Sequence, residues 1–186
     1  MNIAIVGATG NVGRKTLEVL EKKGLTLGNL YLVASSKSAG KKIHFQGKDI
    51  VVSELENFDF SKVKIAFFAA GGKISEKFAE KAAKHCLVID NSSFFRMDPD
   101  VPLIVPQVNS DALNNVKKNI IANPNCSTAQ LVIALKPLHD LFVIKRIVVS
   151  TYQSVSGAGK ASMDELIKQT KLALDGKDIK SENFTK

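Results

Sequence analysis

The segment Gly7–Gly13, GATGNVG, places three glycines at three-residue spacing near the N-terminus. The preceding run Asn2–Val6 ends in continuous apolar residues, which is typical of a strand buried on both faces. The following run, Val12–Lys22, has apolar residues at helical spacing and is ended by Gly24. A glycine turn between a buried strand and a helix binds a pyrophosphate, because the chain turns tightly and the helix N-terminus offers N–H groups. The segment therefore predicts a dinucleotide-binding unit, with a purely structural turn as the alternative.

Further apolar runs alternate with helical patterns along the chain. We expect a helix that has Ser75 as its N-cap and extends through Lys84. Strands that alternate with helices indicate a parallel sheet covered on both faces, so we expect a Rossmann-like, doubly wound α/β domain over residues 1–126. The other predicted strands are Leu30–Ala34, Ile65–Ala70, Leu87–Ile89, Leu103–Val105 and Asn119–Ala122, with a hairpin over Ile43–Val52.

The pattern changes after Cys126, and we expect a second domain over residues 127–186. Ser127–Lys136 and Met163–Leu174 have the periodicity of helices, and Arg146–Val155 is a predicted strand of a different sheet. Together they indicate the start of an α+β domain that is truncated.

Composition limits the classes of function. The chain has 186 residues, of which 45% are hydrophobic and 24% charged, as in folded globular proteins. The net charge of +8 comes mainly from scattered lysines, and only 6% of residues are aromatic, so we expect no nucleic-acid partner. No apolar run has the length of a membrane span, so we expect no membrane partner. The two cysteines have neither metal-ligand spacing nor disulfide-scaffold density, which predicts no metal site and a reducing, cytoplasmic setting.

The end of the second predicted strand bears on the identity of the cofactor. NAD sites have an Asp or Glu there, which binds the ribose hydroxyls. This chain instead has hydroxyls and lysines, which suit the 2′-phosphate of NADP. We therefore expect NADP rather than NAD, with a solvated loop as the alternative. The candidate 2′-phosphate ligands are Ser35, Ser36, Lys37 and Ser38.

The turn NPNCST, residues 123–128, raises the question of a nucleophilic thiol. If a helix begins at Ser127, its dipole and N–H groups stabilise a thiolate at Cys126, which is the form that attacks a carbonyl. The N–H of Cys126 and the amide of Asn125 are then candidates to bind the resulting oxyanion. Most cysteines are instead small buried hydrophobic residues, and Cys86, at the start of a strand, fits that interpretation.

Five segments together carry a family resemblance: GATGNVG, SSKSAGK, DNSSFFRMDPDVPLIVPQVN, NPNCSTAQL and STYQSVSGAGK. In this order and at these intervals they resemble the bacterial-type aspartate-semialdehyde dehydrogenases. The resemblance extends from Met1 to at least Lys160. Related acyl-phosphate reductases share the glycine turn and a cysteine but differ around that cysteine.

The resemblance implies an oxidoreductase that interconverts aspartyl 4-phosphate and aspartate 4-semialdehyde with NADPH, in lysine, threonine, methionine and diaminopimelate biosynthesis. A thioester on Cys126 is the implied intermediate. The implied partners are the small-molecule substrates, phosphate and a second copy in a homodimer. The truncated second domain is then the start of the catalytic and dimerisation domain.

The resemblance also assigns roles to residues. Arg96 is expected to bind the phosphate and Gln153 to orient the substrate, while Gly159 keeps its loop open. The expected cofactor-binding residues are Gly7, Thr9, Gly10, Asn11, Val12, Asn91, Ser156 and Gly157, together with the Ser35–Ser38 segment.

The chain departs from the family in its histidines. The family uses a histidine as the acid–base partner of the thiol, but His44, His85 and His139 are all badly placed for that role in the predicted fold. We therefore expect the chain to be an N-terminal portion of a longer polypeptide, with little activity alone. The alternatives are another acyl-phosphate reductase, such as an N-acetyl-glutamyl-phosphate reductase, and a non-catalytic dinucleotide-binding module.

Overall fold

The computed structural model describes residues 1–181 and divides the chain into two compact units. The first unit is Met1–Arg146 and the second is Ile147–Lys186. Residues 182–186, at the end of the predicted second domain, lie outside the described residues. The predicted domain boundary at residues 126 and 127 stays a prediction.

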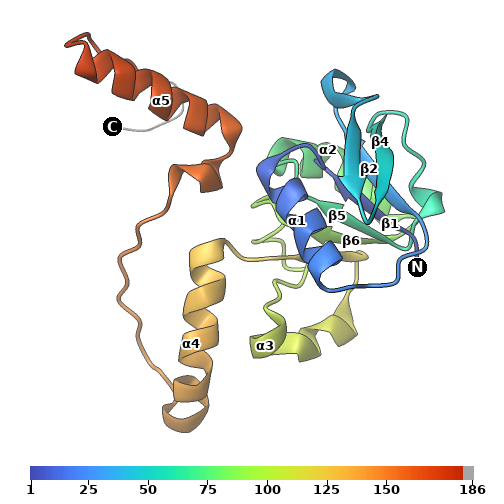
Figure 1. Ribbon diagram of the computed structural model, residues 1–186. Helices are drawn as coiled ribbons and strands as arrows, with labels where there is room; N and C mark the ends of the chain where they lie inside the picture. The colour runs from blue at the N-terminus through green and yellow to red at the C-terminus, as the bar shows by residue number, and fades with distance from the viewer. Residues whose placement is uncertain (182–186) are drawn as a thin grey trace. The chain divides into compact units, whose positions relative to one another are not determined.

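A single sheet of seven strands forms the centre of the first unit, in the order β3-β4-β2-β1-β5-β6-β7 (Figure 1). Neighbouring strands are parallel except at one edge, where β3 and β4 form an antiparallel hairpin. This is the expected doubly wound topology with a hairpin at its edge. The strands are β1 (Ile3–Val6), β2 (Leu30–Ala34), β3 (Lys42–Phe45), β4 (Lys48–Glu54), β5 (Ile65–Phe68), β6 (Leu87–Asp90) and β7 (Ile120–Ala122).

Helices and short 3₁₀ turns connect the strands and make up much of the second unit. In the first unit, the helices are α1 (Asn11–Lys22), α2 (Gly72–Ala83), α3 (Pro106–Asn109) and α4 (Cys126–Phe142). The second unit contains α5 (Lys160–Leu174). The 3₁₀ turns are Ser36–Ser38, Phe60–Lys62, Ser110–Asn115 and Val155–Ala158. No helix among the described residues is long and apolar enough to cross a membrane.

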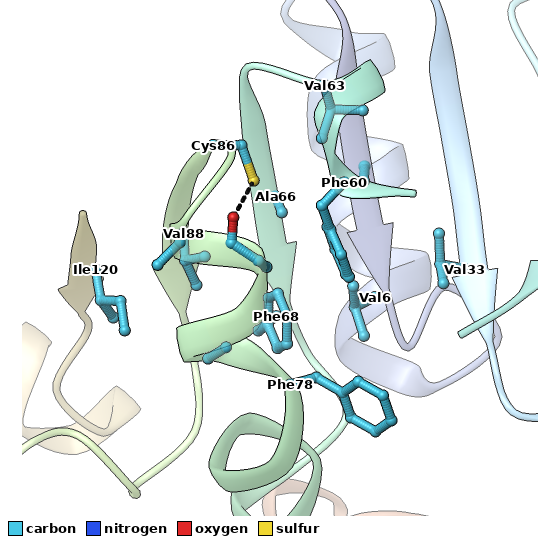
Figure 2. Packing of buried hydrophobic residues seen from close by; sticks show 14 of the residues in the cluster. Val6, Val33, Phe60, Val63, Ala66, Phe68, Phe78, Cys86, Val88 and Ile120 are labelled. Carbon is cyan, nitrogen blue, oxygen red and sulfur yellow. Dashed lines mark hydrogen bonds between the residues drawn. The ribbon is translucent and has the colours of Figure 1, made fainter. Parts of the chain in front are cut away.

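The core consists of two clusters of buried side chains, one on each face of the sheet. Leu17 and Leu20 of α1 pack against one face, around Ile5. Phe78 of α2 packs against the other face, around Val6. Because successive side chains of a strand point to opposite faces, β1 contributes to both clusters. Figure 2 shows the α2-side cluster, in which the Phe60 and Phe68 rings stack with their centroids 6.0 Å apart.

Three local predictions are wrong. Arg146–Val155 forms no strand in the structure; residues 143–154 are irregular, and Ile147, Val148 and Tyr152 are exposed. The β-branched sequence favours a strand, but a strand also needs a hydrogen-bonded neighbour. The segment Leu103–Val105 contributes only an isolated bridge between Leu103 and Ala122.

The third error concerns Ser75, which does not cap α2. The helix begins at Gly72, and its N-cap is Gly71, four residues before Ser75, where the chain turns with a φ of +88° after β5. Ser75 is instead fully buried and donates a hydrogen bond to Asp90.

Candidate active site

Four loops of the first unit follow the carboxyl ends of strands β1, β2, β6 and β7. They are Gly7–Gly10, Ser35–Ser38, Asn91–Arg96 and Asn123–Asn125. Because these strands are parallel, the loops all lie at one edge of the sheet, where α/β proteins bind ligands. The predicted site residues of the first unit come from these loops and from the first turns of α1 and α4.

The glycine turn has the close packing that its sequence predicts. Gly7 has a φ of +86°, and a Cβ there would lie 2.7 Å from the carbonyl oxygen of Ala69. A Cβ on Gly13 would overlap the carbonyl oxygen of Gly7. Glycine at both positions is therefore required by the close packing of the turn, and such a turn suits close approach of a pyrophosphate. Asn11 and Val12 are the first two residues of α1, so their N–H groups belong to the helix N-terminus.

The Ser35–Ser38 segment lies next to the glycine turn. Its residues follow β2, and the Thr9 hydroxyl donates to the Ser38 hydroxyl at 3.4 Å. Ser35, Ser36 and Lys37 are exposed. The two segments predicted to bind the pyrophosphate and the 2′-phosphate thus form one continuous surface.

Arg96 is held by the loops that follow β6 and β7. Its Nε donates to the carbonyl oxygen of Asn123 at 2.8 Å, and its Nη2 donates to that of Asn91 at 3.4 Å. The side-chain amide of Asn123 also donates to the Asn91 side chain at 2.8 Å. Two hydrogen bonds therefore fix the half-buried guanidinium beside the turn that leads to Cys126, and a third joins the two loops that hold it.

Cys126 is the first residue of α4 and is exposed. The side-chain oxygen of Asn125 caps the helix by accepting the N–H of Thr128 at 2.9 Å. This use of the oxygen leaves the NH₂ end of the Asn125 amide as the part able to donate to an oxyanion. The helix predicted after the turn is confirmed, and the thiol lies at its positive end.

Cys86 has the buried environment expected of a structural cysteine. Only 6% of its surface is exposed, and its thiol lies 3.4 Å from the carbonyl oxygen of Ala82 (Figure 2). Burial raises the pKa of the Cys86 thiol to about 11. The prediction that Cys86 is a structural cysteine is confirmed, and the two thiols contrast sharply in accessibility.

The remaining predicted residues, Gln153, Ser156 and Gly157, belong to the second unit. A Cβ on Gly157 would lie 2.5 Å from Nε2 of Gln153, so the glutamine side chain packs against this glycine. The hydroxyl of Ser156 is 2.9 Å from that of Ser154. Gly159 has a φ of +96° and precedes α5 directly. The roles of these residues at the thiol stay predictions.

None of the three histidines is placed to exchange a proton with Cys126. His44 lies on β3, with Nδ1 3.0 Å from Asp49. His85 comes between α2 and β6, and therefore lies at the amino edge of the parallel strands. His139 is in the last turn of α4, about 20 Å from Cys126 at the rise of an α-helix.

A buried polar cluster beneath the Asn91–Arg96 loop was not predicted from the sequence. Asp90 is fully buried and accepts hydrogen bonds from Ser75 and Ser92. The available signal was a carboxylate at the end of a buried strand, followed by two serines. Asn123 was also missed as a residue that connects the two loops.

Comparison with protein families gives two matches that together cover most of the chain. Residues 2–116 match the family model "Semialdehyde dehydrogenase, NAD binding domain". Residues 135–186 match "Semialdehyde dehydrogenase, dimerisation domain".

Similar curated proteins and solved structures agree with these matches. The aspartate-semialdehyde dehydrogenase of Rickettsia bellii is 53% identical over 172 residues, 91% of this chain and 51% of its own length. Aspartate-semialdehyde dehydrogenase 2 of Vibrio cholerae is 51% identical over 186 residues, 99% of this chain and 55% of its own. The chain thus spans about half the length of the curated relatives it matches.

Similar solved structures include complexes with ligands. Aspartate semialdehyde dehydrogenase II of Vibrio cholerae, complexed with ASA, has a TM-score of 0.91 and 50% identity, and is matched over 100% of this chain and 56% of its own. The Candida albicans enzyme with NADP has a TM-score of 0.63 and 30% identity, over 77% of this chain and 48% of its own.

Proposed function

The chain belongs to the semialdehyde dehydrogenase family, and from that premise we propose that it supplies the NADP-binding part and the nucleophile of an aspartate-semialdehyde dehydrogenase. The observation that carries the proposal is the position of Cys126. An exposed thiol begins α4, and the preceding turn is bonded to the loop that holds Arg96. A nucleophile and an anion-binding guanidinium thus lie on adjoining loops at the ligand-binding edge of the sheet.

The chain contains an NAD-binding family domain, and we infer that NADP is its preferred cofactor. The segment Ala34–Lys42 has no Asp or Glu, and Lys37 and the neighbouring hydroxyls suit a phosphate. The glycine turn, where added Cβ atoms would meet backbone, fits a closely approaching pyrophosphate. Asn91 lies at the carboxyl end of β6, where it would approach the nicotinamide, and Ser156 and Gly157 would contribute from the second unit. When bound, NADPH supplies the hydride that reduces the acyl group.

The proposed chemistry of the thiol is acyl transfer. The Cys126 thiolate attacks the acyl carbon of aspartyl phosphate, an S–C bond forms, and the C–O bond to phosphate breaks. The N–H of Cys126 and the NH₂ of Asn125 bind the oxyanion as it forms. Arg96 binds the phosphate as it leaves, which lowers the barrier to C–O cleavage. Gln153 orients the rest of the substrate.

The partner of the chain in this proposal is a second copy. The match to a dimerisation domain over residues 135–186 supports a homodimer. The cytoplasm is the proposed setting, since neither Cys86 nor Cys126 forms a disulfide. The reaction belongs to biosynthesis of the aspartate-derived amino acids.

The assay that tests the function uses the protein as its gene encodes it. With aspartate semialdehyde, phosphate and NADP, we expect formation of NADPH that depends on all three. Cys126→Ser is expected to abolish this activity while cofactor binding persists. Equal or faster turnover of N-acetyl-glutamate semialdehyde would assign the site to another acyl-phosphate reductase. Cofactor binding without any turnover would assign it to a non-catalytic module.

The cofactor preference has a test of its own. We expect the chain to bind NADP more tightly than NAD, measured by titration of the reduced cofactors with fluorescence detection. Lys37→Met is expected to weaken NADP binding about tenfold through loss of a charge-assisted hydrogen bond, with little effect on NAD. An equal effect on both cofactors would place Lys37 away from the 2′-phosphate.

A further inference from the structure

A buried cluster of three polar side chains lies directly beneath the loop that carries Arg96. Asp90, the last residue of β6, has no exposed surface, and its two carboxylate oxygens both accept hydrogen bonds. Oδ1 accepts from the Ser75 hydroxyl at 2.7 Å and from the Ser92 N–H at 3.1 Å. Oδ2 accepts from the Ser92 hydroxyl at 2.7 Å. Buried carboxylates are retained in folded proteins when such donors compensate their lost hydration.

Ser92 connects the buried Asp90 carboxylate to the loop. Its hydroxyl oxygen also accepts the N–H of Phe94 at 3.1 Å, so one side chain links the buried carboxylate to the next turn of backbone. Phe95 follows with only 2% of its surface exposed and fixes the loop in the core. Arg96 comes immediately after this anchor. Ser75 bonds the same carboxylate from α2 and has no hydrogen bond to the loop.

The far side of the loop is tied to β7. Arg96 donates to the carbonyl oxygens of Asn123 and Asn91, while the side chains of Asn123 and Asn91 bond each other. The guanidinium is therefore fixed by contacts on one side and by the path of its backbone on the other. The backbone path depends on Ser92.

We propose that Asp90 and Ser92 are positioning residues that set the place of the Arg96 guanidinium beside the Cys126 turn. The inference rests on the proposed function, because it assumes that Arg96 binds phosphate next to the thiol. The Ser92 hydroxyl acts by holding the loop backbone and does not itself touch the ligand. A guanidinium binds an oxyanion through directed N–H groups, so a displacement of about 1 Å is enough to weaken binding.

The test uses inorganic phosphate and the reactivity of Cys126. Phosphate bound at Arg96 is expected to slow alkylation of Cys126 by iodoacetamide, a neutral reagent, and the concentration dependence gives an apparent Kd for phosphate. Potassium chloride at matched ionic strength controls for screening. The site of labelling is read by peptide mass spectrometry, and rates with and without phosphate are compared within each variant.

Ser92→Ala is expected to raise the apparent Kd for phosphate about tenfold. Ser75→Ala is the matched control, since it removes a hydroxyl bond to the same carboxylate without touching the loop. It is expected to lower the melting temperature and leave the apparent Kd unchanged. Ser92→Thr keeps the hydroxyl and is expected to retain the wild-type Kd.

The outcomes separate this inference from the function on which it rests. If phosphate protects the wild-type thiol but Ser92→Ala has the wild-type Kd, the positioning role is wrong and the proposed function stands. The positioning role is also wrong if Ser75→Ala raises the apparent Kd for phosphate as much as Ser92→Ala does. If Ser92→Ala does not fold, the test rests on Ser92→Thr, which retains the hydroxyl. Weaker phosphate binding by Ser92→Thr than by the wild-type chain would then contradict the proposal. Absence of protection in the wild-type chain overturns the placement of Arg96 in the proposed function, and this inference with it.

Discussion

Gly10 and Gly13 of the first turn differ in what an added side chain would contact. This difference distinguishes the glycine needed for folding from the glycine that affects only ligand binding. A Cβ on Gly13 would overlap the carbonyl oxygen of Gly7, a backbone atom that cannot move freely. A Cβ on Gly10 would meet that same oxygen at 3.4 Å, an ordinary contact, and the φ of Gly10 is −81°. Gly13 is therefore required by the packing of α1, whereas Gly10 restricts only what approaches from outside.

We expect Gly13→Ala to destabilise the first unit by about 2–3 kcal/mol, because overpacking forces the helix away from the turn. Gly10→Ala is expected to leave the free energy of unfolding nearly unchanged and to weaken NADP binding. Urea unfolding and cofactor titration of both variants check this. Equal stability of the two variants would contradict the assigned packing role of Gly13.

The buried thiol gives a prediction at alkaline pH. Burial raises the pKa of Cys86 from an ordinary 9.0 to about 11, so the folded chain releases this proton at higher pH than the unfolded chain. Its contribution to stability is thus fully present below pH 9 and is lost as the pH rises through 11. Urea titrations across this range are expected to show a shallower fall for Cys86→Ala than for the native chain. Parallel curves would mean that Cys86 ionises alike in both states.

At the scale of secondary-structure elements, α4 connects the fold to the chemistry. Its first residue is Cys126, and its cap is the side chain of Asn125. Beyond this turn the helix has no buried residue, although it contains apolar side chains such as Ile133 and Leu138. The N-cap and the contacts of the preceding loop are therefore what hold its beginning in place.

Substitutions of Asn125 separate the cap from the chemistry. Asn125→Ala is expected to cost about 1 kcal/mol of stability, because the Thr128 N–H loses its acceptor. Asn125→Asp keeps an acceptor and is expected to retain that stability, but its negative charge disfavours the neighbouring thiolate and slows alkylation of Cys126. Thermal unfolding and alkylation rates measure the two effects. Faster alkylation in Asn125→Asp would contradict the proposed environment of the thiol.

The elements that were predicted well from the sequence are those determined by residues close to each other along the chain. The strand, glycine turn and helix at Gly7–Gly13, the β3–β4 hairpin and the helix after Cys126 each follow from local periodicity and turn residues. The strand predicted over Arg146–Val155 was wrong because a strand depends on a neighbouring strand that periodicity does not reveal. The N-cap predicted at Ser75 was wrong because the Ser75 hydroxyl bonds Asp90, fifteen residues away, and does not cap its own helix. The contacts around Arg96 likewise join loops distant in sequence and were outside the reach of local patterns.

On the scale of the whole molecule, the first unit contains most of the groups proposed for cofactor binding and the group proposed for nucleophilic attack. It contains no proton acceptor suited to the thiol among the three histidines, since His44, His85 and His139 all lie elsewhere in the described chain. General acid–base catalysis contributes about 10²–10⁴-fold to enzymatic rates. Catalysis therefore requires a proton acceptor for the thiol, which cofactor binding does not require.

We expect residues 1–186 alone to bind NADP and to turn over aspartate semialdehyde at least about 100-fold more slowly than the protein as its gene encodes it, if that protein is longer. The comparison uses NADPH formation per cofactor-binding site, with cofactor titration as the control for folding. Full turnover by residues 1–186 would show that a group within this chain acts as the base.

Cys126 is proposed to form the covalent intermediate. The most direct measurement is mass spectrometry of the protein, as its gene encodes it, after mixing with aspartate semialdehyde and NADP in the absence of phosphate, the group that resolves the thioester. We expect a burst of NADPH and an aspartyl adduct on the peptide that contains Cys126, removed on addition of phosphate. NADPH formation without an adduct on Cys126, or an adduct on Cys86 instead, would show that Cys126 is not the nucleophile.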